Sequence, residues 1–314
     1  MNHETGSGKY EKLLERCLTL EPVPTAVVHP CEISALTGAL EAAEKGLIKP
    51  ILVGPLKKIK EVAAAGKLDL GNMEIVDTPH SHGSATKAVE LVRQGKAELL
   101  MKGSLHTDEL MSAIVSRDGG LRTIRRISHV FVMDVPTYHK VLLVTDGAIN
   151  IAPTLEDKVD ICQNAIDLAI AIGCERPKVA ILAAIETVNS KMMATIDAAA
   201  LCKMADRGQI TGGILDGPLA FDNAISKEAA ITKGIISEVA GDPDILLAPD
   251  LEAGNILAKL LTFLSNADSA GLVLGARVPV ILTSRADSVR SRIASCAVAM
   301  IAVHANRKTA KAVG

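Results

Sequence analysis

The sequence predicts an α/β fold with mainly parallel sheets, and three observations support this prediction. Short apolar runs alternate with segments of helical periodicity along almost the whole chain, as expected of βαβ units. The chain has 314 residues, 48% of them hydrophobic, which is enough for two lobes with buried cores. The alternation contains no short-period repeat and no low-complexity linker. Sheets covered by helices on both faces account for all three observations.

Six apolar runs in the first half of the chain predict strands. Each is short, rich in Val, Ile or Leu, and bounded by polar residues, Gly or Pro, as buried strands are. The predicted strands are residues 25–30, 50–55, 73–78, 98–103, 129–134 and 141–147. Apolar residues recur at helical spacing in residues 32–46 and 85–95, which predicts helices between strands.

The same alternation continues after residue 150. Predicted helices cover residues 154–173, 189–206, 227–240 and 255–264, and predicted strands cover 178–184, 210–217 and 244–250. Close to the C-terminus, an apolar run ends in Thr283-Ser284-Arg285, and an amphipathic helix pattern follows at once. The second half therefore repeats the architecture of the first.

Composition excludes several classes of function. The chain has 34 basic and 36 acidic residues, whereas a general nucleic-acid binder needs a surplus of Lys and Arg. It has no Trp, two Tyr and three Phe, so the aromatic platforms that bind single strands are also missing. We therefore expect a small-molecule ligand and no nucleic acid.

Targeting and metal signals are weak. The polar start of the chain lacks the apolar region of a signal peptide, and every apolar run is shorter than the roughly 20 residues that span a bilayer. We expect a cytoplasmic protein with no membrane contact. The six cysteines form no C-x-x-C pair, and His80 and His82 have no convincing third ligand nearby. We therefore expect neither disulfides nor a metal.

Five predicted strands end in small or polar clusters. In open α/β sheets the carboxyl ends of the strands form the ligand crevice. The candidate residues for binding substrate at these ends are Lys102, Gly103, His106, Thr107, Thr145, Asp146, Asn150, Asp216, Gly217, Pro218, Asp250, Gly254 and Asn255.

Each cluster has a functional and a structural interpretation. Lys102 would supply a positive charge for a phosphate or carboxylate, and Gly103 would allow close backbone approach. Asp216 and Asp250 would act as general bases or orient a polar ligand. Thr107 taken alone is better explained as a helix N-cap, and Asp-Gly-Pro is common in turns. No segment matches the phosphate-binding pattern G-x-x-x-x-G-K-[ST].

The segment Ser284-Arg285-Ala286-Asp287 also has two interpretations. Ser and Asp at this spacing fit a capping box for the helix that follows, and capping alone is the commoner explanation of such a pattern. Capping does not explain Arg285, because a cation is mildly unfavourable at a helix N-terminus. A guanidinium beside free backbone N–H groups would favour a bound anion. The basic run at residues 122–129 is interpreted as exposed surface.

Taken together, the strand-end motifs resemble a known family. The motifs LLMKGSLHT, GLRTIRRISHVFVMD, VTDGAIN, ILDGPLAFDNAIS, APDLEAGN and ILTSRADS, in this order and spanning almost the whole chain, resemble the phosphate acetyltransferase and phosphate butyryltransferase family. The resemblance implies a two-lobed fold similar to isocitrate and isopropylmalate dehydrogenases, with mainly parallel sheets, an interdomain cleft and a homodimer. It implies a discontinuous first domain (residues 1–146 and 272–314) and a second domain (147–271).

The resemblance also implies a reaction. Acyl-CoA and inorganic phosphate would give acyl phosphate and CoA, with coenzyme A as substrate or product and no cofactor or metal. The family's Ser-Arg pair maps onto Ser284 and Arg285, with Arg285 on the phosphate and Ser284 on the thioester. Asp287 is a further candidate catalytic residue, as a general base. The family's Asp seven residues after this Ser is replaced here by Ser291, so the sequence leaves the general base open.

Two alternatives keep the same fold. One is a metal-dependent decarboxylating dehydrogenase, although its paired Asp cluster and Arg-rich substrate motif are not found in the sequence. The other is a non-catalytic module that binds CoA or acyl phosphate.

Overall fold

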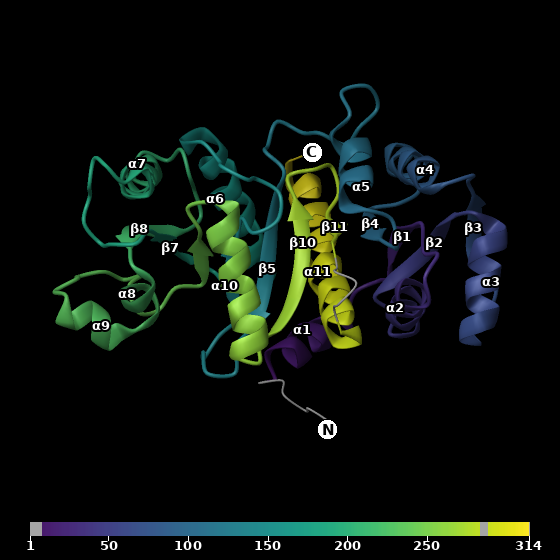
Figure 1. The fold of residues 1–314 in the computed structure, drawn as a ribbon, viewed down its shortest axis with the longest axis horizontal. Coiled ribbons are helices and arrows are strands. Elements are labelled where there is room, and N and C mark those ends of the chain that lie inside the picture. Colours follow the sequence, from purple (N-terminus) through teal and green to yellow (C-terminus); the bar gives the residue numbers. More distant parts are fainter. Residues whose placement is uncertain (1–7, 283–287, 314) are drawn as a thin grey trace. The chain divides into compact units, whose positions relative to one another are not determined.

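The chain divides into two compact units. The computed structural model describes residues 8–282 and 288–313 (Figure 1). The central unit comprises the chain up to Lys9 and Arg126–Ser269, and the terminal unit comprises Tyr10–Arg125 and the chain from Ala270 onward. The boundary between Arg125 and Arg126 lies about 20 residues before the expected one at 146, while the boundary between Ser269 and Ala270 differs from the expected one by two residues. The reason is the antiparallel pairing of β5 with β6, which keeps both strands in the central unit.

The sheet of the terminal unit is mainly parallel. Its strands lie in the order β3-β2-β1-β4-β11-β10. All neighbours are parallel except β10 and β11, which are antiparallel. The strands are β1 (Val23–Val28), β2 (Ile48–Gly54), β3 (Glu74–Asp77), β4 (Leu99–Lys102), β10 (Asp268–Leu274) and β11 (Val280–Ile281). The expected α/β architecture is therefore confirmed for this unit.

Within the described residues, six helices accompany this sheet. They are α1 (Lys9–Cys17), α2 (Ile33–Glu44), α3 (Leu56–Gly66), α4 (Ser81–Arg93), α5 (Thr107–Val115) and α11 (Val289–Val313). Helix α4 packs against α5 and against β1 and β2, while α2 packs against α3 and α11. The apolar residues that predicted strands and helices form the buried core between these layers.

The central unit contributes a second group of strands, which are also mainly parallel. Its strands lie in the order β5-β6-β9-β7-β8, and only β5 and β6 are antiparallel. The strands are β5 (Ser128–Asp134), β6 (Leu142–Thr145), β7 (Lys178–Leu182), β8 (Ile214–Leu219) and β9 (Ile245–Leu247). The helices are α6 (Leu155–Ala171), α7 (Met193–Asp206), α8 (Phe221–Ile225), α9 (Lys227–Thr232) and α10 (Leu251–Leu264).

Several predicted elements of the central unit have different bounds, and two of the differences have a clear cause. The strand expected at 210–217 begins and ends later, because Gly212 and Gly213 belong to the turn before β8 and the strand continues through Pro218. The helix expected at 227–240 ends at Thr232, because Gly234 takes a positive φ of 67° just after it.

Helix α11 is buried on all sides through much of its length. Every residue from Ser291 to Val303 is buried, whereas Val289 at its start is 45% exposed. The expectation of an amphipathic helix is therefore wrong, because polar residues between the apolar positions are enclosed as well, including Arg292, whose Nη1 donates to the Ser34 carbonyl oxygen at 3.2 Å. The hydroxyl of Ser288 accepts a hydrogen bond from the Ser291 N–H at 3.0 Å, so Ser288 is the N-cap of α11.

The ends of β1 and β4 approach closely at Gly103. The Gly103 N–H donates to the Val28 carbonyl oxygen at 2.8 Å, and Ser104 N–H donates to the His29 carbonyl oxygen at 3.0 Å. A Cβ atom on Gly103 would lie 2.6 Å from the His29 carbonyl oxygen and would also clash with that of Val28. Only glycine therefore fits between these two strand ends.

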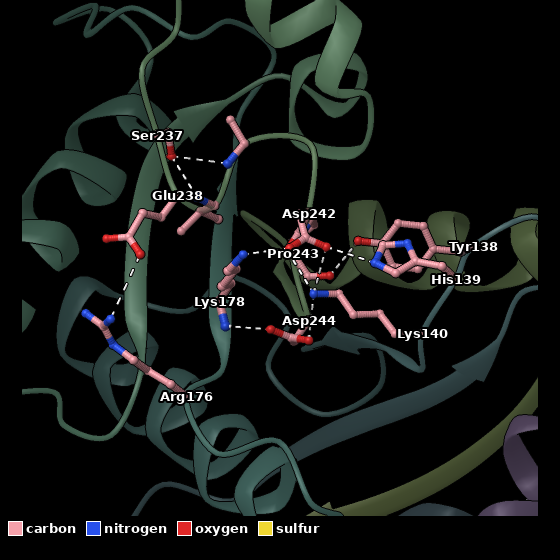
Figure 2. Close-up of polar contacts among 12 residues, drawn as sticks. Tyr138, His139, Lys140, Arg176, Lys178, Ser237, Glu238, Asp242, Pro243 and Asp244 are labelled. Atoms are coloured by element: carbon pink, nitrogen blue, oxygen red, sulfur yellow. Dashed lines mark hydrogen bonds and ion pairs between the residues drawn. The ribbon is translucent and has the colours of Figure 1, made fainter.

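An ion-pair cluster joins three segments of the central unit (Figure 2). Lys178 at the start of β7 lies 2.6 Å from Asp242, and Lys140 lies 3.0 Å from Asp242 and 2.8 Å from Asp244. The Tyr138 hydroxyl donates to the Pro243 carbonyl oxygen at 2.6 Å. Partial burial raises the pKa of Asp242, but the hydrogen bonds and charges of the two lysines lower it further, to about 2.

We predict that Gly103→Ala separates the ends of β1 and β4. The added methyl group meets backbone atoms that cannot rotate away, so the terminal unit should lose about 1–3 kcal/mol of stability. Urea unfolding measures this loss. Gly83→Ala is the matched control, because a Cβ there meets only side-chain atoms, at 3.3 Å or more. Equal stability of the two variants would contradict the close approach.

We predict that the ion-pair cluster loses its contribution to stability in acid. The folded pKa of Asp242 is about 2 against an ordinary value of 3.8, so its contribution is complete above pH 3.8 and falls as the pH approaches 2. The difference in Tm between wild type and Asp242→Asn should therefore shrink between pH 5 and pH 2. The same comparison with Asp118→Asn, which removes an exposed carboxylate, should show no such trend. A constant difference for Asp242→Asn would reject the assignment.

Candidate functional site

The parallel strands of the terminal unit bring several sequence motifs together at the carboxyl ends of the strands, and this end of the sheet is called the edge below. Strand β4 pairs in parallel with β1 on one side and β11 on the other. Ile281 pairs with Met101, so Leu282 follows in register with Lys102. Ser284, Arg285 and Asp287 lie outside the described residues. Leu282, the last described residue before them, therefore lies beside Lys102, and Ser288, the first described residue after them, is the N-cap of α11.

Lys102 is a buried cation at this edge. Only 7% of it is exposed, and its Nζ lies 3.4 Å from the Gly103 carbonyl oxygen. A buried ammonium is costly unless polar or negative groups surround it, and the Gly103 carbonyl oxygen is one such group. The sequence prediction of a cation at the end of β4 agrees with this placement.

His106 and Thr107 lie at the start of α5, on the same edge. His106 is the N-cap residue, its side chain is exposed, and it makes no capping hydrogen bond. Thr107 is the first helical residue rather than the cap that the sequence suggests. The N–H groups of the first turn of α5 have no partner inside the helix, and helix N-termini favour anions.

A histidine that the sequence analysis overlooked lies at the end of β1. His29 has a positive φ of 55°, and its Nδ1 lies 3.0 Å from the Ser84 hydroxyl, which lies 2.8 Å from the Thr78 hydroxyl. Burial and the nearby Lys58 lower the pKa of His29, and Glu109 opposes them. The imidazole is therefore neutral at neutral pH. Its position directly after an apolar strand was a signal that the sequence offered.

In the central unit, Asp146 organises the loop that follows β6. Its carboxylate accepts hydrogen bonds from the backbone N–H groups of Ala148, Ile149 and Asn150 and from the Asn150 side chain. The Thr145 hydroxyl donates to the His129 carbonyl oxygen at 2.8 Å. Thr145, Asp146 and Asn150 are all buried, so their polar groups hold the loop in shape.

The second acidic motif lies against this loop. Asp250 is the N-cap of α10 and accepts from the Ala253 N–H at 2.8 Å. Asn255 donates to the Gly147 carbonyl oxygen at 2.8 Å. A Cβ on Gly254 would clash with the Asp146 carbonyl oxygen, so glycine is required there. The structure thus brings the Asp146 and Asp250 motifs together, as their places at neighbouring strand ends predict.

The third motif lies apart from these two. Asp216, Gly217 and Pro218 are inside β8, and the strand ends at Leu219. Strand β8 is the last in the sheet and is separated from β9 by β7. Asp216 accepts a hydrogen bond from the Gly217 N–H, and a Cβ on Gly217 would lie 2.8 Å from Ile181. The expected strand end at this motif is therefore wrong.

His129 on β5 is a buried histidine with a neutral ring. It is 1% exposed and lies against Phe131, and its Nδ1 has no hydrogen-bond partner among the described residues. Burial lowers its pKa to about 4, and the charge of Asp146 opposes that shift.

Two searches of the described residues give negative results. No group of three or more His, Cys, Asp or Glu side chains in residues 8–282 and 288–313 is arranged to hold a metal ion. No helix in the same part of the chain is both long enough and apolar enough to span a bilayer.

Curated relatives match along nearly the whole chain. A phosphate acetyltransferase of Rhizobium meliloti is 65% identical over 96% of this chain and 95% of its own length. A phosphate butyryltransferase of Clostridium beijerinckii is 42% identical over 96% of this chain and 100% of its own.

Solved structures agree with the sequence relatives. A branched-chain phosphotransacylase from Enterococcus faecalis superposes with a TM-score of 0.77 at 31% identity, covering 89% of this chain and 99% of that one. A 4-hydroxythreonine-4-phosphate dehydrogenase from Salmonella typhimurium shares the fold at a TM-score of 0.57 and 14% identity, over 90% and 100% of the two chains. Residues 80–300 match the family described as "Phosphate acetyl/butaryl transferase". The chain therefore belongs to the phosphate acetyl/butyryl transferase family.

Proposed function

We propose that this protein is a phosphate acyltransferase that converts acyl-CoA and inorganic phosphate into acyl phosphate and CoA. The observation that carries the proposal is the 65% identity to a phosphate acetyltransferase over 96% of this chain. A butyryltransferase is 42% identical over the same share, so acetyl and butyryl groups are both candidate acyl chains. We also propose the finer fold assignment that the resemblance implies, the isocitrate and isopropylmalate dehydrogenase-like fold.

The chemistry needs positioned charge rather than a protein nucleophile. A phosphate oxygen attacks the thioester carbonyl, the carbon–sulfur bond breaks, and the thiolate takes up the proton that the phosphate loses. Negative charge builds on the carbonyl oxygen and then on sulfur. Donors fixed in place before the reaction stabilise both charges.

In the terminal unit, the carboxyl ends of β1, β4 and β11 carry groups of the kind that this reaction needs. Lys102 supplies a buried positive charge, and the first turn of α5 supplies N–H groups. Ser284, Arg285 and Asp287 follow β11 in the sequence, and we keep them as the proposed catalytic residues. Arg285 would bind the phosphate bidentately, and Ser284 would donate to the thioester.

The remaining binding residues keep narrower roles. In the central unit we propose that Asp146, Asn150, Asp250 and Asn255 bind substrate through the loop that they hold together. Asp216, Gly217 and Pro218 inside β8 would contribute only through the backbone of that strand.

We assign the exchange of the thiol proton to His29. It stands at the end of β1, against the Gly103–Ser104 backbone, and the Ser84 hydroxyl fixes its Nδ1 side. That hydrogen bond leaves Nε2 as the atom that faces away from Ser84. A neutral ring takes a proton from the CoA thiol when acyl phosphate is consumed and returns it in the opposite direction. His29 would thus act as the general base that the sequence left open at Ser291.

Other properties are proposed on the strength of the family. We propose that the enzyme is a cytoplasmic homodimer that needs no cofactor and takes CoA as substrate or product. The decarboxylating dehydrogenase and the non-catalytic CoA-binding module remain as the rival functions. The names of the relatives favour the acyltransferase over both.

The reaction is tested with purified protein. CoA thiol should be released from acetyl-CoA or butyryl-CoA only when phosphate is present, and arsenate should replace phosphate because acyl arsenate hydrolyses. Thiol release is followed with a colorimetric reagent. Release of thiol without either oxyanion, or from neither thioester with them, would contradict the proposal. Reduction of NAD by a 2-hydroxy acid with magnesium would favour the dehydrogenase.

The role of Arg285 is tested by Arg285→Ala. Loss of a preorganised donor should lower kcat/KM by about 100-fold to 1000-fold and raise the KM for phosphate. Arg290→Ala is the matched control, because Arg290 is half-exposed and pairs with Glu11 at 2.6 Å. It should change kcat/KM by no more than about twofold. Equal effects of the two substitutions would reject the assigned role.

The role of His29 is tested with acyl phosphate and CoA as substrates. The lowered pKa of His29 predicts that kcat/KM falls as the pH drops through a value below 6.5, because only the neutral ring accepts the thiol proton. In His29→Gln that limb of the profile should disappear and the rate should fall, while the exposed-residue control His82→Gln should keep both. An unchanged acid limb in His29→Gln would contradict the assignment.

A further inference from the structure

A pocket lined by four arginines lies in the terminal unit. Its volume is about 610 Å³, within the range of small-molecule sites. Arg93, Arg117, Arg122 and Arg277 line it together with Ser116 and two glycines. No carboxylate belongs to the lining. Arg122 belongs to the basic run that the sequence analysis interpreted only as surface.

None of these four guanidinium groups has a partner within the described residues. Other arginines of the same unit are paired, such as Arg307 with Glu98 and Arg290 with Glu11. For the four arginines of the pocket, no ion pair or side-chain hydrogen bond exists in residues 8–282 and 288–313. Four like charges around one hollow repel one another, and an anion in the hollow relieves that repulsion.

The backbone that carries these arginines is held firmly. Arg122 and Ala276 form an antiparallel bridge, and the Arg277 N–H donates to the Leu121 carbonyl oxygen at 2.9 Å. The Thr123 hydroxyl donates to the Gly275 carbonyl oxygen at 2.6 Å. The segments that carry Arg122 and Arg277 are therefore joined, and the pocket does not depend on a ligand to form.

Glycine shapes the opposite wall. Gly119 has a positive φ of 85°, and a Cβ there would lie 2.8 Å from Nη1 of Arg93. A Cβ on Gly120 would lie 2.6 Å from the Ile114 carbonyl oxygen. The turn after α5 is thus tight enough to hold the Arg93 guanidinium against it.

The pocket lies near the amino-terminal ends of the parallel strands, whereas the candidate active site lies at their carboxyl ends. Helix α5 starts beside Lys102 and runs for nine residues, about 13 Å, before Ser116 and Arg117. Arg277 precedes β11, whose far end leads toward Ser284, and Arg93 ends α4, which begins beside the end of β3. The four arginines therefore do not belong to the strand-end crevice.

We propose that this pocket is a second anion site, which binds a small phosphorylated molecule with at least two phosphate groups. All four cations are arginines, whose planar guanidinium groups match phosphate oxygens bidentately. Four of them can satisfy more oxygens than one phosphate offers, which is the reason for expecting a diphosphate or larger group. The proposal stands independently of the catalytic assignment.

The test measures binding of inorganic pyrophosphate by titration calorimetry to wild type, Arg117→Gln and Arg277→Gln. Each substitution should weaken binding by about tenfold or more, because each removes charge-assisted hydrogen bonds. Arg207→Gln is the matched control, since it removes an exposed arginine of the central unit that lies outside the pocket. It should leave the affinity within about twofold. Thermal unfolding of each variant checks that the fold is intact.

Kinetic constants separate this site from the substrate site. The KM values for acyl-CoA and for phosphate should stay the same in Arg117→Gln and Arg277→Gln. If either KM rises along with the loss of pyrophosphate binding, the pocket belongs to the substrate site and the proposal is wrong. Unchanged pyrophosphate affinity in both variants, or an equal loss in Arg207→Gln, would also overturn it.

Discussion

The parallel pairing of β4 with β1 on one side and β11 on the other is the constraint on which the rest of the terminal unit depends. It brings the ends of three strands, distant in the sequence, to one edge. The pairing is possible only because Gly103 leaves room for the Val28 and His29 carbonyl oxygens. Lys102, His29 and the chain that leads to Ser284 are then neighbours by register. The pairing of the backbone strands therefore determines which side chains meet at this end of the sheet.

The cations of the protein are used in two different ways. In the central unit, Lys140 and Lys178 are neutralised by Asp242 and Asp244, and they join the starts of strands (Figure 2). In the terminal unit, the arginines of the pocket face one another with no carboxylate among them. The first arrangement holds segments together, and the second is suited to an anionic ligand, because arginine side chains match phosphate oxygens.

Sequence reasoning predicted the elements best where one periodicity dominated. The apolar runs identified the strands from β1 to β9, and the strand-end rule found Lys102 and the neighbouring Asp146 and Asp250 motifs. It failed where the signal was not periodic. The sequence pattern of α11 did not show that the helix is enclosed on all sides. Pro218 suggested that β8 ends before it, whereas the strand continues through it. The four arginines of the pocket come from separate segments, which only the fold brings together.

The discontinuity of the terminal unit has a consequence for synthesis on the ribosome. Residues up to Arg125 emerge first, yet β11, one of the two neighbours of β4, comes from the chain after Ala270. The central unit is almost one continuous segment and can fold in the meantime. Throughout that interval the nascent chain carries β4, whose residues are all buried in the finished protein, as an open strand edge. That edge stays open to pairing with another chain until β11 has been made.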